Sequence, residues 1–350
     1  MHEYVGNIHI HSAYSDGSGT VEEIACEAQK AHLDFIIITD HETLKGCLEK
    51  KEGWYGNTLV LIGTELNRDD HHYLAFNVME ELNSDGLKPQ EVINLVNQKG
   101  GFGFIAHPFE KGSPFVLKGR HYPWTDWNVS GFKGIEIWNY TSQCRDGITD
   151  YLRFIYTLLF YRNSNVDRPN PEALKKWDKL LTGSRKVLAV GGTDAHAIRV
   201  KIGPLKAVVF PYEYLFKTIN THLILNRLFS GEKKLDRQFV YEALSSGHYF
   251  TANDKIYSSR GFNFTAENDE EHVLQGDAIN INKKTALKVT SPAARSLIRV
   301  IKDGKVVSES PSNNLIFKVL ERGAFRVEVY YRSLLGITRP WIYSNPIFVY

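Results

Sequence analysis

The stretch GNIHIHSAYSD at residues 6–16 contains the pattern that decides the fold. Its first five residues are expected to form a strand, and His9 and His11 stand two positions apart near the end of that strand. On a strand, this spacing turns both imidazoles to one face. The segment GGTDAH repeats the arrangement with Asp194 and His196, again after an apolar run. Both pairs are therefore expected at strand ends, where a barrel or an open sheet keeps its active site.

Further side chains of the same chemical kinds lie between the two pairs, several of them just past another apolar run. They are Asp16, His41, Glu65, His72 and His107. Histidine nitrogen and carboxylate oxygen are the usual ligands of zinc, manganese or iron at hydrolytic centres. A single histidine near a strand end is more often structural, but this many candidates together predict a multinuclear metal site.

The composition is that of a globular chain with an ample core. Hydrophobic residues make up 43% of the 350 residues and charged residues 23%, and the length suggests two domains. The net charge of +2 is too small to indicate a nucleic-acid partner. Cys26, Cys47 and Cys144 include no CxxC pair, which excludes a Cys-based zinc ribbon and favours a reducing, cytoplasmic setting.

No membrane association is expected from the apolar segments. The sequence before the first strand has no secretory signal. The longest apolar stretch, Tyr151–Tyr161, contains Arg153 and is about half as long as a membrane span. It is predicted to be a buried helix.

Residues 1–255 are expected to form the first domain, and the first 210 of them alternate short apolar runs with helical patterns, which indicates β/α units around parallel strands. Thr20 and Glu23 have the spacing of a capping box at the start of a helix, and residues 212–247 are expected to be helical and to close the barrel. The expected strands cover residues 6–10, 35–39, 59–64, 72–78, 102–106, 134–138 and 186–190, with a helix at 89–99. About seven such units can close into a TIM-like barrel slightly smaller than the eight-stranded form.

Residues 256–350 have a different pattern, with short alternating strands and no convincing helix. Asp303–Gly304 between two apolar arms predicts a tight hairpin. We expect a small C-terminal antiparallel β-sandwich domain after the α/β domain.

The motifs of the first half carry a family resemblance. HIHSAYSDGS, ITDHE, GTE, AHP and GGTDAH, in this order, resemble the motifs of the polymerase-and-histidinol-phosphatase (PHP) superfamily. Within it, the sequence is most similar to the carbaryl-hydrolase-like (CehA/McbA-type) branch. That likeness rests on GFIAHPF, on EIWN at residues 136–139, on KKWDKLLTGSRKVLAVGGTDAH, and on ALSSGHYF before a β-rich tail.

The resemblance implies a distorted (β/α)7 barrel that holds two to three divalent transition-metal ions (Zn, Mn or Fe) at its mouth. It implies three overlapping ligand sets, namely His9, His11, Glu65 and Asp194; then Glu65, His72 and His107; then Asp16, His41 and His196. Asp16 takes a place that is histidine in some members. Because His9, His11 and Asp194 would converge on one cation, the first and last barrel strands are expected to be neighbours.

The chemistry expected of such a site is hydrolysis without a covalent intermediate. A bridging carboxylate holds two cations close together, and water bound between the cations loses a proton near neutral pH and can attack a phosphorus or carbonyl centre. Neither a GxSxG elbow nor Ser–His–Asp spacing is present. We expect Glu65, His41 and Asp194 to be catalytic.

Two neighbouring acids have other expected roles. Asp40 either orients His41 or caps the following loop, and Glu136 is expected to make a structural hydrogen bond.

The segment 109–131 is long, basic and aromatic, and such connections are usually functional or disordered. It leaves the strand that should deliver His107, so its basic side chains could contact an anion. Its tryptophans could wall an apolar group, or could simply pack on the barrel. The predicted substrate contacts are Lys111, Arg145 and Arg199, with Lys118 and Arg120 as further candidates.

The favoured function is that of a metal-dependent phosphoesterase acting on a small, anionic molecule, since clustered cations suit a phosphate's charge. Hydrolysis of a carbamate, ester or amide at the same site is the alternative, and it would need a mainly apolar, aromatic pocket. A non-catalytic binding module is the third hypothesis, although every expected ligand position has a competent side chain. A homo-oligomer is possible on this evidence.

Overall fold

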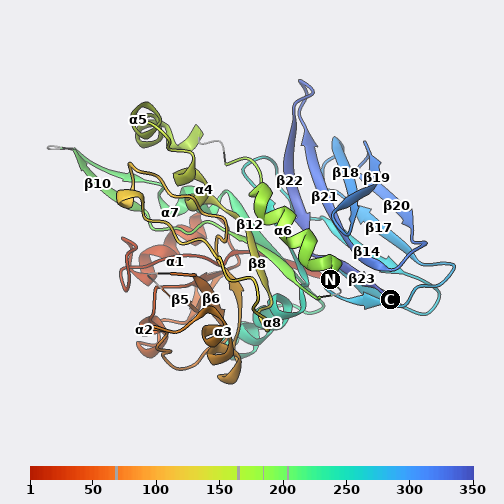
Figure 1. Cartoon of the computed structure of the whole chain (residues 1–350), viewed down its shortest axis with the longest axis horizontal. Helices are drawn as coiled ribbons and strands as arrows, with labels where there is room; N and C mark the ends of the chain where they lie inside the picture. Colours follow the sequence, from red (N-terminus) through yellow and green to blue (C-terminus); the bar gives the residue numbers. More distant parts are fainter. Residues whose placement is uncertain (68–69, 164–165, 184, 203–204) are drawn as a thin grey trace.

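The computed structural model describes residues 1–67, 70–163, 166–183, 185–202 and 205–350, and Figure 1 shows their arrangement. A first sheet runs through the N-terminal region in the order β3-β4-β2-β1-β12-β13. Its strands are β1 (His2–Asn7), β2 (Phe35–Ile38), β3 (Gly53–Tyr55), β4 (Thr58–Ile62), β12 (Ile219–Leu225) and β13 (Tyr249–Asn253). β1, β2 and β4 are parallel neighbours, as their continuous apolar runs predict, and β2 and β4 are buried throughout.

A second sheet has the order β5-β6-β7-β8-β9. Its strands are β5 (Thr64–Leu66), β6 (Tyr73–Phe76), β7 (Phe102–Ile105), β8 (Gly134–Asn139) and β9 (Leu188–Gly192). β7, β8 and β9 are parallel, but β6 is antiparallel to both neighbours, so the expectation of parallel strands throughout is wrong there. The connection between β5 and β6 is too short for the crossover that a parallel pair requires.

Single bridges connect the two sheets at both flanks. Ile10 bridges Ala195 in parallel just beyond β1 and β9, and His41 bridges Glu65 beyond β2 and β4. The neighbouring contact is a hydrogen bond of 2.9 Å from His11 N to the Ala195 carbonyl. The first and last strands are therefore neighbours, as expected. In the described part of the chain, these bridges take the place of one continuous barrel, so the predicted distorted (β/α)7 barrel is confirmed only as a mixed α/β fold.

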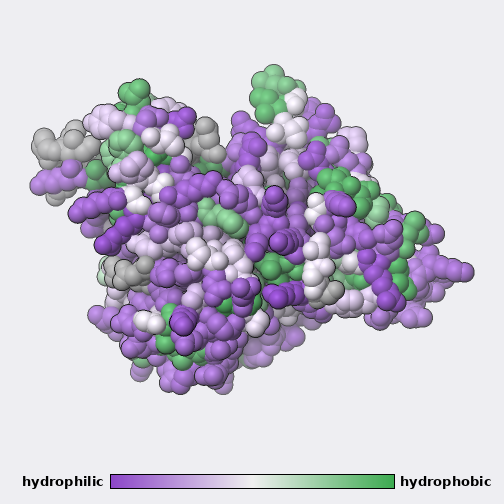
Figure 2. Space-filling model, in the orientation of Figure 1, coloured by the Kyte–Doolittle hydropathy of each residue, from purple (hydrophilic) through white to green (hydrophobic). Residues whose placement is uncertain are grey.

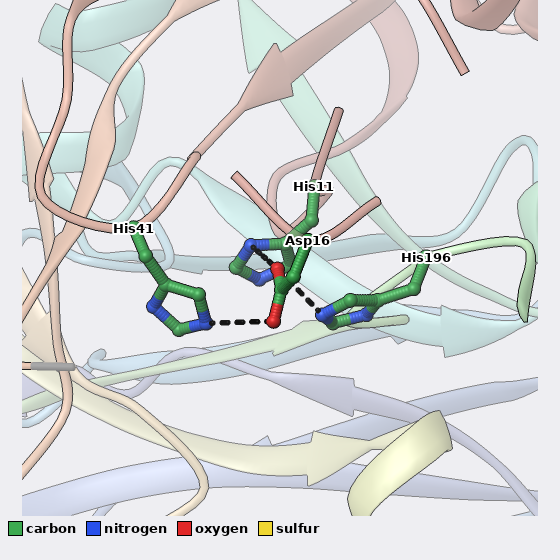
Figure 3. Close-up of side chains that lie close together, drawn as sticks. All are labelled: His11, Asp16, His41 and His196. Carbon is green, nitrogen blue, oxygen red and sulfur yellow. Dashed lines mark ion pairs between the residues drawn. The ribbon is translucent and has the colours of Figure 1, made fainter. Parts of the chain in front are cut away.

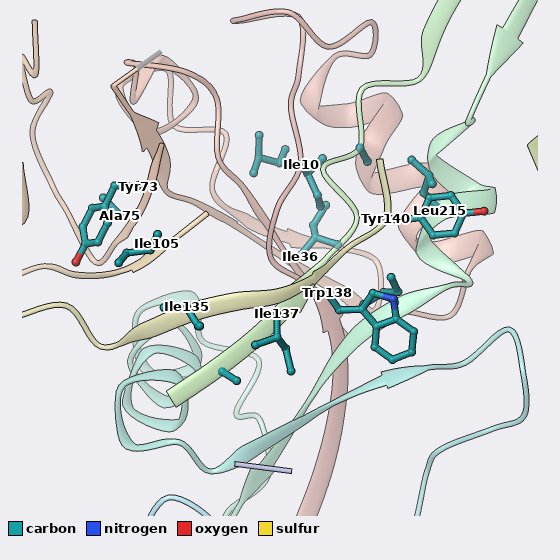
Figure 4. Packing of buried hydrophobic residues seen from close by; sticks show 14 of the residues in the cluster. Ile10, Ile36, Tyr73, Ala75, Ile105, Ile135, Ile137, Trp138, Tyr140 and Leu215 are labelled. Carbon is teal, nitrogen blue, oxygen red and sulfur yellow. The ribbon is translucent and has the colours of Figure 1, made fainter. Parts of the chain in front are cut away.

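Apolar side chains from both sheets pack into a common core. Ile10, Ile36, Ile105, Ile135 and Trp138 are almost completely buried in it (Figure 4). Because Ile10 lies between two predicted ligands and points into this core, it fixes which face of the strand His9 and His11 occupy.

Helices cover the two sheets. They are α1 (Val21–Lys30), α2 (Lys45–Leu48), α3 (Pro89–Gln98), α4 (Tyr140–Asp146), α5 (Tyr151–Phe160), α6 (Pro171–Thr182), α7 (Tyr212–Phe216) and α8 (Lys233–Ser246). α1 begins with the predicted capping box, in which Thr20 Oγ1 accepts from Glu23 N and the Glu23 carboxylate accepts from Thr20 N. None of the described helices is long and apolar enough to cross a membrane.

Two helical predictions need correction. Residues 212–247 are not helical throughout, because β12 lies between α7 and α8; its alternating THLIL pattern is better suited to a strand, which pairs with β1. The helix predicted at 151–161 exists as α5, but it is not buried, and Leu152 is 81% exposed. An unpredicted hairpin, β10 (Ile198–Ile202) with β11 (Leu205–Val209), follows β9.

The C-terminal region consists of sheets that are antiparallel, as expected, except that the short strand β16 (Ala278–Ile279) pairs in parallel with β23 (Ile347–Val349). One contains β14 (Asn263–Glu267), β15 (His272–Leu274), β17 (Ala286–Thr290) and β20 (Asn314–Lys318). The other contains β16, β18 (Ser296–Lys302), β19 (Lys305–Ser310), β21 (Gly323–Arg332), β22 (Thr338–Ser344) and β23. The two share one core that includes Phe264, Val300 and Trp341, and Asp303–Gly304 is the turn of the β18–β19 hairpin.

The second of these sheets continues the first sheet of the N-terminal region, since β22 pairs with β13 and Ser344 stands opposite Phe250. A domain boundary between residues 255 and 256 stays a prediction. The pairing of β13 with β22 joins strands on the two sides of this boundary.

Candidate metal centre

The two i, i+2 pairs of donors meet where the chain leaves β1 and β9. The Ile10–Ala195 bridge places His9 and His11 beside Asp194 and His196. His11 Nε2 is 3.2 Å from Asp194 Oδ1, and His9 Nε2 is 3.5 Å from the same oxygen. His9, His11 and Asp194 form a group with Glu65, and the potential ligand atoms of these four residues all lie within 4.8 Å of one another. This group has the same four residues as the first predicted ligand set.

Glu65 lies at the centre of the cluster, and its two oxygens face different imidazoles. Oε2 is 3.2 Å from His9 Nε2 and 3.1 Å from His11 Nε2. Oε1 is 2.9 Å from His72 Nδ1 and 3.1 Å from His107 Nε2. A carboxylate in this position can bridge two cations, one on each side. The predicted second set, Glu65 with His72 and His107, is therefore assembled on one oxygen.

A third group surrounds Asp16 (Figure 3). Its carboxylate lies 3.3 Å from His196 Nε2, 3.6 Å from His11 Nδ1 and 3.7 Å from His41 Nε2. His41 also approaches Glu65, with Nδ1 3.5 Å from Oε2. The Asp16 side chain is 41% exposed, whereas His9, His11 and Glu65 are buried, so this group is the most open to solvent.

The charges in the cluster are strongly coupled. Burial opposes ionisation of Glu65 and Asp194, but the imidazoles outweigh it and hold the pKa of each carboxyl well below its usual value. Burial likewise disfavours charged His11, yet the Asp194 and Glu65 carboxylates outweigh it and raise its pKa to about 10. Burial lowers the pKa of His41 to about 3 despite the nearby Glu65 carboxylate, and nearby His11 and His72 add to the decrease.

The donor set fits divalent transition metals. In the described part of the chain, both ring nitrogens of His11 and the Nδ1 atoms of His41 and His107 are buried and lie 3.1–3.6 Å from carboxylate oxygens, but none of them makes a hydrogen bond of good geometry. Buried polar atoms in folded proteins are normally satisfied, and leaving them unpaired is costly. Imidazole nitrogens that converge with carboxylates in a buried cluster are suited to zinc, manganese or iron.

Two acids outside the ligand set hold its members in place. Glu136 Oε1 lies 3.1 Å from His9 Nδ1, while Oε2 accepts from His107 N at 2.9 Å, which confirms its structural role. Asp40 accepts hydrogen bonds from Ser12 N and Oγ and from Ser15 Oγ. The Asp40 carboxylate therefore holds the loop between His11 and Asp16 in place, whereas the expectation was a contact with His41 or with the loop that follows Asp40.

Tyr212 is a positioning residue that the sequence did not predict. Its hydroxyl lies 2.7 Å from the His11 carbonyl and 3.2 Å from the His196 carbonyl, and it accepts from Ser18 N and Gly19 N. Burial raises its pKa to about 12, so it keeps its proton for donation. α7 thereby connects the two donor pairs through their backbones.

Backbone conformation in the cluster is unusual at two ligand positions. Asp194 has φ of 53° and His107 has φ of 23°, in the region that favours glycine. Strain of this kind costs of the order of 1–3 kcal/mol for each residue and concentrates at functional sites.

A model of the PHP domain family matches residues 7–190. The chain belongs to the PHP domain family. The uncharacterized protein MJ1587 of Methanocaldococcus jannaschii is 32% identical to it over 158 residues, which cover 41% of this chain and 85% of that protein.

Solved structures similar to this PHP-domain protein are more distant. A two-domain protein from Bacteroides vulgatus, described as containing a predicted PHP-like metal-dependent phosphoesterase, is 14% identical with a TM-score of 0.45, covering 99% of this chain and 95% of that one. An amidohydrolase from Chromobacterium violaceum is 14% identical with a TM-score of 0.31, covering 55% of this chain and 87% of that one.

A cavity of about 440 Å³ opens onto the cluster of the PHP domain. Seven of the predicted donors line it, and so do Lys118, Arg120, Arg145 and Tyr122. The Tyr122 ring stacks on His72, with centroids 4.4 Å apart. The buried Glu110 carboxylate pairs with Arg145. Tyr122 and Glu110 were not singled out from the sequence, where a lone tyrosine and a lone glutamate in a long loop give no signal.

The three predicted substrate contacts have different positions. Arg145 lines the cavity, and Arg199 donates from Nη2 to the Ser18 carbonyl at 2.9 Å beside a neighbouring hollow. Lys111 does not line the cavity; it is exposed and pairs with Glu172 at 2.7 Å. Of the loop's tryptophans, Trp124 is 2% exposed and packs into the core, in agreement with the alternative of tryptophans packed on the barrel.

Proposed function

We propose that this PHP-domain protein is a metal-dependent phosphoesterase. The observation that supports this best is the cavity shared by the donor cluster and three cationic side chains, Lys118, Arg120 and Arg145. A phosphate ester has negative charge spread over several oxygens, and arginine and lysine beside divalent cations are suited to that charge. A cleavage site for neutral esters does not require this density of positive charge.

In this proposal, the three ligand groups hold two to three divalent ions of zinc, manganese or iron. The group His9, His11, Glu65 and Asp194 and the group Glu65, His72 and His107 share Glu65 through opposite oxygens. The more open group of Asp16, His41 and His196 would hold the third. The ions would supply an activated water and would neutralise the charge that develops on the phosphoryl oxygens.

The side chains of the chain itself bind and orient the substrate. Arg145, paired with Glu110, and Lys118 and Arg120, which line the same cavity, would contact phosphate oxygens. The histidines of the cluster would bind a metal ion in their neutral form, in which an imidazole nitrogen keeps a lone pair for ligation. Glu65 and Asp194 stay ionised for the same purpose.

An apolar hollow beside the cluster favours a second candidate, hydrolysis of a carbamate, ester or amide on the same centre. This candidate is consistent with the proposed place of the chain in the carbaryl-hydrolase-like branch. This candidate ranks second because Lys118, Arg120 and Arg145 line the same cavity as the donors, and a neutral substrate does not need these positive charges.

The test is an assay of the manganese-loaded and zinc-loaded protein on phosphomonoesters, phosphodiesters, carbamates and carboxylic esters. Phosphoesters should be hydrolysed, activity should disappear on chelation, and it should return when the metal is restored. Asp194→Ala and His9→Ala should lose both bound metal and turnover, whereas His272→Ala, in an exposed C-terminal strand, should keep both. Turnover of carbamates without any turnover of phosphoesters would overturn the proposal in favour of the second candidate.

A further inference from the structure

A second hollow, of about 640 Å³, begins at the metal centre and leads away from it. It has residues in common with the first cavity, since both are lined by Asp16, Arg145, Asp194 and His196. A molecule whose reacting group lies against the donor cluster therefore has space for a further part in this hollow.

The walls of this second hollow are mainly apolar, and several separate segments contribute them. Phe115 comes from the loop after His107, Phe154 and Leu158 from α5, and Ile198 and Val200 from the β10–β11 hairpin. The Phe115 and Phe154 rings stack with centroids 6.4 Å apart, which joins the loop to the helix. Phe115 and Ile198 are 40% and 42% exposed, so apolar surface here is left open to water.

The position of α5 explains why its sequence is apolar although the helix is not buried. α5 stands at the edge of the PHP domain in Figure 1, and hydrophobic surface gathers in that area in Figure 2. Leu158 points to the hollow and packs against the main core, whereas Leu159 on the outer side is 66% exposed. The inner side of α5 is thus a wall of the hollow.

The charged or titratable residues that line this hollow are the four it shares with the first cavity and Arg199. Arg145 and the donors belong to the end shared with the first cavity. Arg199 is held by the Ser18 carbonyl. Among the described lining residues, the wall formed by α5 and the hairpin offers no further charge to a ligand.

We propose that the substrate is an amphiphilic phosphoester, with its phosphate at the donor cluster and an alkyl or aryl group in the apolar hollow. This inference rests on the proposed phosphoesterase function and names its substrate class. Covering exposed apolar walls with an apolar group is favourable by about 0.8 kcal/mol for each methylene, which corresponds to roughly a fourfold gain in kcat/KM for each.

The experiment compares methyl, butyl, hexyl, octyl and phenyl phosphates as substrates of the manganese-loaded wild-type protein. The value of kcat/KM should rise by roughly fourfold for each methylene until the hollow is filled. Leu158→Ser should reduce kcat/KM for octyl phosphate by about tenfold or more, with little change for methyl phosphate. Leu159→Ser, one position along the same helix, is the matched control and should leave the whole series unchanged.

Inhibition by alkylphosphonates of the same chain lengths gives a second reading on the wild-type protein, independent of how Leu158→Ser folds. Hydrolysis that is equally efficient across the series, with inhibition independent of chain length, would overturn this inference and leave the phosphoesterase proposal standing. Absence of any phosphoester turnover in the metal-loaded protein would overturn both. Circular dichroism of each variant verifies that it is folded.

Discussion

Glu65 occupies the position on which the geometry of the candidate metal centre depends. Each of its two oxygens contacts its own pair of imidazoles at about hydrogen-bond distance, so replacing the carboxylate would separate the ligand groups. Its backbone also joins the two sheets through the bridge to His41. Structural and chemical roles therefore coincide at this residue.

Glu136→Gln should weaken metal binding by about 10–100-fold, the usual effect of losing an outer partner of a ligating histidine. The glutamine has one acceptor oxygen, which can face either His107 N or His9 Nδ1. Its NH2 group only donates, so it cannot accept the second hydrogen bond. Metal titration against a competing chelator measures the effect. Glu172→Gln at the surface is the control, and equal affinity in the two variants would contradict the positioning role.

Tyr212→Phe should lower the free energy of unfolding by about 1–3 kcal/mol, because the buried Gly19 N–H and the His11 carbonyl lose their hydroxyl partner. Urea denaturation of the metal-free protein measures this loss. Tyr156→Phe on α5, where the side chain is 50% exposed, should have almost no effect. If Tyr212→Phe were as stable as the wild-type protein, the four hydrogen bonds of the Tyr212 hydroxyl would make no net contribution to the free energy of unfolding.

At the residue scale, the sequence indicated the candidate ligands and one of the residues that hold them, Glu136, but not Tyr212. His9, His11 and Asp194 could be predicted because strand alternation and apolar flanks leave a local pattern. Tyr212 could not, because its hydroxyl contacts a backbone carbonyl 201 positions away, and any residue type offers that carbonyl. Lys111 and Arg145 looked equivalent as cations in or near a loop, and only the fold separates the exposed one from the one in the cavity.

At the scale of elements, the structure departs from the predicted fold where the hydrophobic periodicity of a segment determines neither the direction of a strand nor the burial of a helix. β6 has the apolar run of a buried strand, but its direction follows from the short connection to β5. Apart from Arg153 and Thr157, α5 has an apolar sequence, and such a sequence is expected in a core. The hollow beneath it leaves part of that surface open instead. The parallel pairs β1–β2 and β2–β4 were predictable because their runs are continuous and buried.

β12 carries a buried histidine that makes stability depend on pH. His222 lies between the carboxylates of Asp254, 3.0 Å from Nε2, and Glu3, 2.7 Å from Nδ1. Burial favours neutral His222, but Asp254 and Glu3 outweigh it and raise its pKa to about 9. A raised histidine pKa contributes stability that is complete below the unfolded value, about 6.5, and is lost as pH rises through the folded value.

The expected result is a fall in the urea midpoint of the wild-type protein between about pH 6.5 and pH 10. His222→Gln should be less stable at pH 6.5 and should show a flatter dependence over the same range, because it lacks the titrating group. Subtracting the two curves removes the contribution of other groups that titrate above pH 9. Parallel curves for the two proteins would show that His222 is not the source.

At the scale of the whole molecule, the C-terminal sheets are bound to the PHP domain by several kinds of contact. β22 pairs with β13, and the Trp138 and Tyr343 rings lie 5.8 Å apart. The buried Arg326 of β21 makes two hydrogen bonds, of 2.8 and 2.9 Å, to Asp178 of α6. These contacts make the two regions depend on one another, whichever residue marks their boundary.

A chain cut after residue 255 should therefore fail to give stable protein. The cut would leave the β13 edge unpaired and would expose the apolar residues that face the shared C-terminal core, such as Phe250. The measurement is the soluble yield and urea midpoint of residues 1–255 alone and co-expressed with residues 256–350. Soluble, cooperatively folding 1–255 with wild-type metal content would contradict the expected dependence.

The hydrogen bond from Ala189 N to Asn345 Oδ1, at 2.8 Å, joins residues 156 positions apart. Ala189 belongs to β9, the strand that leads to Asp194 and His196. During synthesis on the ribosome, Asn345 is added 156 residues after Ala189. At about 5–20 residues per second, this delay is of the order of ten seconds. Until then β9, which leads to two of the candidate ligands, lacks the partner of its Ala189 N–H group.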